Sequence, residues 1–147
     1  MNLLEKIADN KSLLQFVKYC TVGVLNTIVC LGVIFICKSL IGLNPYLSNA
    51  LGYIAGVINS FLWNKKWVFN SDGRLAHEAI KFLVGFGICY ALQFVVVWAI
   101  SHGSFGRREF DLSVFTLSGY GVATLVGNVV YTVTNYLYNR LFTFRSK

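Results

Sequence analysis

Two short segments of this chain carry aromatic, amide and basic side chains in the same order. Residues 61–69 read Phe-Leu-Trp-Asn-Lys-Lys-Trp-Val-Phe, and residues 136–144 read Tyr-Leu-Tyr-Asn-Arg-Leu-Phe-Thr-Phe. Lys and Arg bind phosphate through charge-assisted hydrogen bonds, and Trp and Tyr rings are enriched where a membrane meets water. The pattern therefore predicts contacts with an anionic lipid headgroup. Membrane anchoring combined with a topology signal is the alternative interpretation.

Basic residues also precede two apolar stretches, at Lys18 and Lys81. If these lysines lie at the same membrane face as the two aromatic segments, they could complete a basic ring around one phosphate. Each segment also holds an Asn between its aromatic and basic residues, which simple anchoring does not require. The candidate headgroup-binding residues are Lys18, Asn64, Lys65, Lys66, Trp67, Lys81, Asn139 and Arg140.

Amide side chains occur inside the apolar stretches as well. Asn26, Asn59 and Asn135 are the candidates for substrate contact there. Each could simply form a hydrogen bond between helices, or it could offer donors and acceptors to sugar hydroxyls and phosphate oxygens. Because an unsatisfied amide in hydrocarbon is costly, the number of these side chains favours a polar interior in at least one place.

Four stretches without any charged side chain must position these residues: 19–37, 39–64, 82–106 and 112–139. A helix that rises about 1.5 Å per residue crosses the hydrocarbon core with about 20 residues. The sequence therefore predicts an all-α membrane protein, with residues 1–147 forming a single membrane domain. We expect four transmembrane helices at about 17–37, 45–64, 81–101 and 112–138. Residues 1–16 would be a cytoplasmic segment, either an interfacial amphipathic helix or a frayed tail.

The distribution of Lys and Arg predicts the orientation. The chain has 13 of these residues and a net charge of +7. Most of them lie before the first span, between the second and third, or after the fourth, whereas Lys38, Arg107 and Arg108 lie on the other side. The positive-inside rule then places both termini and the middle connection in the cytoplasm.

The matching segments divide the chain into two halves, each with a basic start, a span, an outer loop, a span and an aromatic-basic end. Two spans per half make both halves insert the same way, so we expect parallel two-helix repeats. Small residues at Gly52, Gly56, Ala123 and Gly127 should let helix backbones approach closely. We expect the second and fourth spans at the centre of a four-helix bundle. The same small residues would also suit a homo-oligomer.

Several classes of function are disfavoured by what the apolar stretches lack. Apart from His102 near the end of the third stretch, they contain no Asp, Glu, Lys, Arg or His, whereas proton-coupled transporters use such groups within the membrane. Neither a P-loop nor a nucleophile with its base can be identified, so we expect neither an enzyme nor a cofactor. The four Cys show no CxxC spacing and are interpreted as apolar fillers, not as metal ligands. The basic residues are not interleaved along a soluble face, which argues against a nucleic-acid partner.

The segments 16–27 and 59–69 resemble the GtrA-like family of small bacterial membrane proteins, and the resemblance extends over nearly the whole chain. It implies a multi-pass protein of the bacterial cytoplasmic (inner) membrane. It also implies movement of a polyprenyl-phosphate-linked sugar, or of the polyprenyl phosphate carrier, in the synthesis of cell-surface polysaccharide or teichoic acid. A membrane glycosyltransferase is the implied partner.

The family's motif positions fall here on Lys18, Gly23, Asn26, Asn59, Asn64, Lys65, Trp67 and Phe69. The second half departs from the pattern, because Cys89 takes the position of Asn26. Two other functions remain open. The chain could be a non-catalytic membrane scaffold that holds a glycosyltransferase, or it could transport a small solute.

Overall fold

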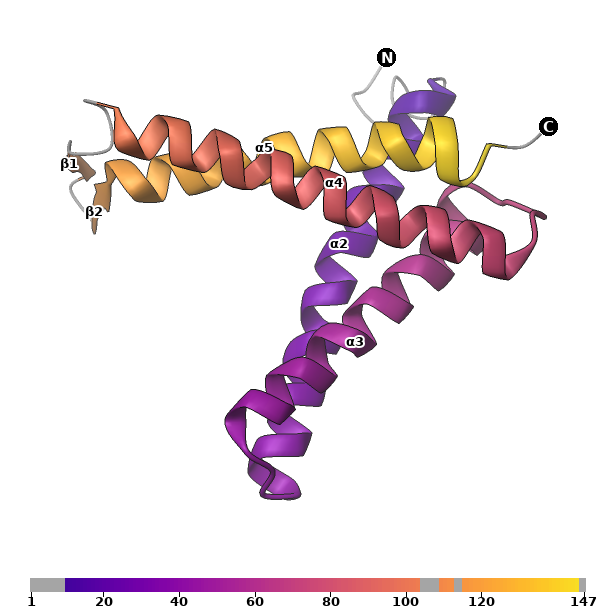
Figure 1. Ribbon diagram of the computed structural model, residues 1–147, viewed down its shortest axis with the longest axis horizontal. Helices are drawn as coiled ribbons and strands as arrows, with labels where there is room; N and C mark the ends of the chain where they lie inside the picture. Colours follow the sequence, from indigo (N-terminus) through magenta and orange to yellow (C-terminus); the bar gives the residue numbers. More distant parts are fainter. Residues whose placement is uncertain (1–9, 104–108, 113–114, 146–147) are drawn as a thin grey trace, which may run out of the picture. The chain divides into compact units, whose positions relative to one another are not determined.

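Two helical hairpins form the part of the chain that the structure describes, which is residues 10–103, 109–112 and 115–145 (Figure 1). The structure is a computed structural model. The first hairpin belongs to a unit that ends at Gly73, and the second to a unit that spans Arg74–Arg145.

The first unit contains α2 (Lys11–Phe35) and α3 (Pro45–Trp63), which lie side by side (Figure 1). Helix α2 continues into a π-helical turn, η1 (Ile36–Leu40). Helix α3 likewise ends in a π-helical turn, η2 (Asn64–Val68). Gly42 lies between the two helices with φ of 77°, a conformation that glycine adopts without the steric cost other residues have.

Asparagine side chains fix the starts of both helices in this unit. The Asn10 carboxamide oxygen accepts hydrogen bonds from the backbone N–H groups of Ser12 and Leu13. That of Asn44 accepts one from the backbone N–H of Tyr46 at 2.8 Å. These bonds satisfy donors that have no partner within the first turn of a helix.

The second unit contains α4 (Leu75–His102) and α5 (Gly119–Tyr138), which also lie side by side (Figure 1). Between them in the sequence are two antiparallel strands, β1 (Glu109–Leu112) and β2 (Phe115–Ser118). Helix α5 ends in the π-helical turn η3 (Asn139–Thr143).

Apart from this short pair of strands, the regular elements of the described residues are helical, which agrees with the expected all-α membrane fold. Helix α5 begins at Gly119, later than the expected start of a span near residue 112. The Ser118 hydroxyl accepts a hydrogen bond from the backbone N–H of Gly121, so this side chain caps α5. Apolar and polar residues alternate through residues 109–112 and 115–118, as is typical of strands. Residues 112–139 carry no charged side chain, so the strand pattern and the helix pattern together give one expected span.

Glycine brings the helices of each unit close together. A Cβ atom added to Gly52 or to Gly127 would collide with a side chain of the neighbouring helix and approach one of its carbonyl oxygens. The residues met are Cys30 and Ile34 at Gly52, and Gln93 and Val97 at Gly127. A Cβ atom added to Gly56 would lie in ordinary contact with α2, and Ala123 on α5 is fully buried.

The remaining helix faces expose apolar side chains. On α2 a stripe of these residues lies at helical spacing, at Val24, Ile28, Leu31 and Phe35, and each is about 60% exposed. Such a surface suits lipid hydrocarbon and not water. Two helical segments of the described residues, Lys11–Leu40 and Leu75–His102, are long and apolar enough to cross a membrane. Of the expected N-terminal segment, residues 1–9 lie outside the described part, and Lys11 onward belongs to α2.

Candidate functional site

The two aromatic-basic segments form the same unusual backbone structure. Each leaves its α-helix through a π-helical turn that begins at its asparagine, in η2 and in η3. The turn closes with a hydrogen bond between residues five apart, from Phe69 to Asn64 and from Phe144 to Asn139, both at 2.9 Å. Turns of this kind are rare and occur frequently at functional sites. We call these two segments, Asn64–Phe69 and Asn139–Phe144, the exits.

Both exit asparagines are buried, and the side-chain oxygen of each accepts no hydrogen bond from the described residues. Asn64 is 1% exposed and Asn139 is 0% exposed. Each side-chain nitrogen donates to the residue one turn earlier, Ser60 Oγ at 3.2 Å and Asn135 Oδ1 at 3.3 Å. Among the described residues, neither asparagine Oδ1 atom has a hydrogen-bond partner. An unsatisfied buried acceptor costs stability, so both units carry the same unfavourable feature at the same place.

A lysine from the first helix of each unit lies against the exit. In the first unit, Lys18 Nζ lies 5.4 Å from the centre of the Trp67 ring, in a cation–π contact. In the second, Lys81 Nζ donates to the backbone carbonyl of Phe142 at 3.3 Å. Trp67 and Phe142 occupy the same position of the two exits. Each unit therefore brings one lysine from its first helix to the aromatic residue of its exit.

The other basic residues of the exits have different environments. Lys65 Nζ donates to the carbonyl of Gly73 at 2.7 Å, and Arg140 donates from Nη1 to the Tyr136 hydroxyl at 3.3 Å. Lys66 is exposed. Positive charge thus gathers at both exits, partly held by hydrogen bonds to the protein and partly exposed.

Ring contacts repeat in the same way. Tyr19 of α2 contacts Phe69 edge to face, with centroids 6.4 Å apart. Phe82 of α4 contacts Phe144, with centroids 6.2 Å apart. Together with the two lysines, the two asparagines and the two close glycines, these pairs support the interpretation of the chain as a tandem repeat.

The amides within the helices mostly bond to one another. Asn59 donates from Nδ2 to Asn26 Oδ1 at 2.8 Å and so joins α3 to α2. At the matching place in the second unit are Cys89 and Thr134, and the Thr134 hydroxyl donates to the backbone carbonyl of Val130 at 2.7 Å. Asn135 is 4% exposed; its nitrogen donates to the Tyr131 hydroxyl and its oxygen accepts from Asn139.

Asn26 and Asn59 thus hold their helices together, as the alternative interpretation of these residues had it. Both side chains are half-buried, so this hydrogen bond does not enclose them completely.

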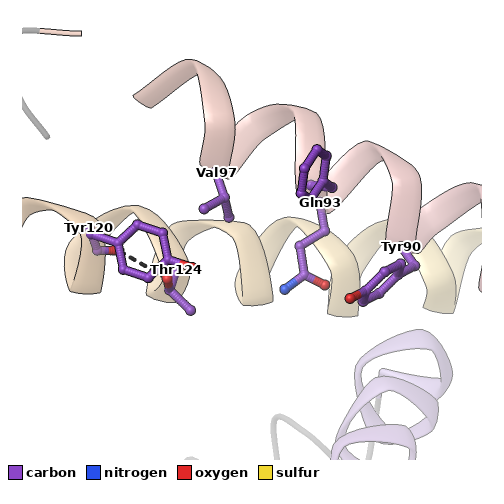
Figure 2. Close-up of a pocket in the computed structure, with 6 residues that line it drawn as sticks. Tyr90, Gln93, Val97, Tyr120 and Thr124 are labelled. Carbon is purple, nitrogen blue, oxygen red and sulfur yellow. Dashed lines mark hydrogen bonds between the residues drawn. The ribbon is translucent and has the colours of Figure 1, made fainter. Parts of the chain in front are cut away.

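One polar pair of the second unit was not among the candidates from the sequence. Gln93 donates from Nε2 to Asn128 Oδ1 at 2.7 Å and joins α4 to α5. Beside it lies an open cavity of about 130 Å³, lined by Tyr90, Gln93, Phe94, Val97, Tyr120 and Thr124 (Figure 2). The presence of both residues in apolar stretches was visible in the sequence, but their pairing depends on how α4 and α5 are aligned.

Comparison with known proteins supplies a family. The family described as "GtrA/DPMS, transmembrane domain" matches residues 18–144, which include most of α2, all of α3, α4 and α5, and both exits.

Individual relatives cover different parts of the chain. YngA, an uncharacterised membrane protein of Bacillus subtilis (strain 168), is 34% identical over 71 residues, which are 46% of this chain and 45% of that protein. The chain therefore spans less than half the length of this relative. A bactoprenol-linked glucose translocase of Shigella phage SfV is 27% identical over 117 residues, 80% of this chain and 89% of the relative. Another bactoprenol-linked glucose translocase, from Salmonella phage P22, is 26% identical over 130 residues, which are 88% of this chain and 94% of that relative.

Proposed function

The chain belongs to the GtrA/DPMS transmembrane domain family, and we propose that it binds a polyprenyl-phosphate-linked sugar and assists its movement across the membrane. The bare polyprenyl phosphate carrier is an alternative cargo with the same headgroup chemistry. The names of the two phage relatives, both bactoprenol-linked glucose translocases, support this class of cargo. These names describe translocases and not catalysts, which favours a protein without an enzyme's reaction.

The observation that carries the proposal is the recurrence of the exit. A membrane anchor needs aromatic and basic residues, but it does not need a buried asparagine with an unsatisfied oxygen at a π-helical turn. Turn η1 provides the contrast within this chain, because it contains Lys38 but no asparagine. We propose that each exit uses its cations to bind a substrate phosphate, with charge-assisted bonds from Lys65 at the first exit, near Lys18 and Lys66, and from Arg140 at the second, near Lys81.

The prenyl tail would stay outside the protein. Helices α2 to α5 expose apolar side chains along their lengths, which gives a long hydrocarbon chain a surface to lie against in the bilayer. Only the headgroup then requires a polar path. Asn26, Asn59 and Asn135 are proposed to contact it between the exits and the far ends of the helices.

The remaining features of the proposal concern the setting. We propose four spans, both termini in the cytoplasm and a location in a bacterial cytoplasmic membrane. A membrane glycosyltransferase that makes or uses the lipid-linked sugar is the proposed partner, and a homo-oligomer held by Gly52 or Gly127 is compatible with this function.

The decisive experiment measures transport and binding with the purified full chain. The parent protein in lipid vesicles should move labelled polyprenyl-phosphate-glucose between the leaflets, whereas protein-free vesicles should not. Lys65→Gln and Arg140→Gln should each weaken binding of polyprenyl phosphate by roughly 13- to 160-fold, the worth of one hydrogen bond to a charged group.

Lys38→Gln is the matched control, because Lys38 also lies in a π-helical turn but outside the exits. It should bind as the parent does. A parent protein that binds the lipid but never moves it would instead support the scaffold function. If both exit variants bound polyprenyl phosphate as tightly as the parent does, the exits would serve only as membrane anchors.

A further inference from the structure

The cavity in the second unit has the composition of a sugar site. Tyr90 and Gln93 on α4 and Tyr120 and Thr124 on α5 line it, with Phe94 and Val97 completing the wall (Figure 2). Binding pockets typically combine aromatic and apolar walls with a few polar groups that fix orientation. A hexose presents both kinds of surface, since its C–H face is apolar and its rim carries hydroxyls.

The polar groups of this cavity retain hydrogen-bonding capacity. The bond between Gln93 and Asn128 uses one donor and one acceptor, which leaves one amide oxygen and one amide nitrogen of the pair without a partner among the described residues. The hydroxyls of Tyr90 and Tyr120 likewise have no protein partner in the described part of the chain, and their side chains are 58% and 61% exposed. A sugar hydroxyl, which both donates and accepts, matches this set.

The aromatic residues of the cavity have no counterpart in the sequence of the first unit, although the two units share the contacts of their exits. In the alignment that matches Tyr19 with Phe82 and Asn64 with Asn139, no aromatic ring occupies any cavity position in the first unit. The residues there are Thr27, Cys30, Leu31, Ile34, Pro45 and Asn49. The units thus share the basic exit and differ in the cavity.

The cavity lies far from the exit of its own unit. Gln93 is about 18 Å along α4 from Lys81, and Thr124 is about 22 Å along α5 from Asn139, at 1.5 Å per residue. In a sugar phosphate, a single oxygen separates the phosphorus from the sugar ring. A phosphate held at exit η3 therefore cannot have its sugar in this cavity.

We propose that the cavity is a second binding site for the substrate, which holds its neutral hexose near the hairpin β1–β2 while the phosphate is away from the exits. This inference rests on the proposed function. It divides translocation into a phosphate-binding stage at the basic exits and a sugar-binding stage at the opposite end of the second unit. Uncharged donors suit the sugar-binding stage, since they would not trap the phosphate.

Calorimetric titration of the purified protein in detergent tests the inference. The parent should bind polyprenyl-phosphate-glucose more tightly than bare polyprenyl phosphate. Gln93→Leu should reduce that preference by roughly 2- to 13-fold, the worth of one neutral hydrogen bond, without changing the affinity for the bare lipid. Tyr120→Ala should reduce it too, and Tyr120→Phe, which keeps the ring, should reduce it less.

Tyr46→Ala is the matched control, since Tyr46 is an exposed tyrosine in the first turn of α3, as Tyr120 is in the first turn of α5. It should leave the preference unchanged. A full preference for the glucosylated lipid in folded Tyr120→Ala and Gln93→Leu would overturn the inference.

A phosphate-free probe separates this inference from the proposed function. Farnesyl glucoside should bind the parent, and it should bind Tyr120→Ala more weakly, regardless of whether the exits bind phosphate. If the parent bound neither phosphate lipid, the proposed function would fail, and the glucoside titration would still decide the cavity. If the glucoside bound parent and variant equally, the sugar site alone would be wrong.

Discussion

At the scale of single residues, Asn64 and Asn139 are the side chains whose chemistry is least explained by folding. Each buries an amide oxygen without a partner among the described residues, which costs about 1–3 kcal/mol relative to a satisfied acceptor. A residue of similar size without the amide would avoid that cost. Because the same cost occurs in both units, we infer that the amides serve ligand binding or a change in the π-helical turns, where such a group could find a partner.

Replacing these asparagines should separate stability from function. We expect Asn64→Leu and Asn139→Leu to keep the free energy of unfolding within about 1 kcal/mol of the parent, because one satisfied donor and one unsatisfied acceptor are lost together. Binding and transport of the polyprenyl lipid should fall. Thermal unfolding in detergent and vesicle transport measure the two effects, with Asn49→Leu, on an exposed position of α3, as the control. A large loss of stability with normal transport in the surviving protein would make the amides purely structural.

The sequence pattern identified the exit asparagines but not their burial. The order and spacing of residue types can be read from the sequence, and they are enough to identify both exits and the resemblance to the family. The direction of an asparagine side chain at a helix end depends on whether the last turn is α or π, which no local pattern indicated. For the same reason the sequence shows Gln93 and Asn128 only as polar residues of two separate stretches, and does not reveal that they pair beside a cavity.

At the scale of the helices, each unit packs closely at a glycine of the same position, and the second unit does so also at Gly85, where a Cβ would collide with the ring of Tyr138. Gly52 and Gly127 lie at matching positions, and each contacts the matching two residues of the neighbouring helix. Gly23 and Gly32 of α2, by contrast, have no atom within 4 Å of where a Cβ would lie. Four-residue spacing of small residues favours such contacts in membranes, but spacing alone does not distinguish a packed glycine from an open one.

Leucine at the packed positions should separate the helices. Gly52→Leu and Gly127→Leu should lower stability by about 1–3 kcal/mol or more, the usual cost of overpacking, and should lower the folded yield in detergent. Gly32→Leu is the control and should be neutral or slightly stabilising, because it only replaces an open helical glycine with a better helix former. Size-exclusion profiles and thermal unfolding measure both. Equal stability of all three variants would place Gly52 and Gly127 against lipid.

The hairpin β1–β2 shows where sequence reasoning about elements failed. A charge-free window satisfied the length needed for a span, so the strand residues Phe115–Ser118 were assigned to the fourth helix. The two-residue alternation was present in the sequence, yet it is short and adjoins a long helical pattern. A hydropathy window averages over such a change.

At the scale of the whole molecule, the order of the elements within each unit places both exits beside the starts of α2 and α4. Lys18 contacts the first exit and Lys81 the second, so each exit lies at the end of its unit where the first helix begins. Six residues, 69–74, separate η2 from α4, too few to cross the hydrocarbon core as a helix, so we expect the first exit and the start of α4 at the same membrane face. Since these regions hold most of the Lys and Arg, the positive-inside rule predicts that both exits face the cytoplasm and that the sugar cavity lies toward the opposite leaflet.

Cysteine labelling tests this orientation in a variant whose four native cysteines are replaced by alanine. Asp72 and His102 are exposed; Asp72 precedes the start of α4 in the sequence and His102 is the last residue of that helix, whereas Ser71 is buried and would react poorly. A membrane-impermeant maleimide added to intact cells should label His102→Cys but should label Asp72→Cys only after permeabilisation. The reverse pattern would put the exits outside and the cavity toward the cytoplasm. The phosphate would then be gathered from the outer leaflet, which suits return of the bare carrier more than delivery of the sugar.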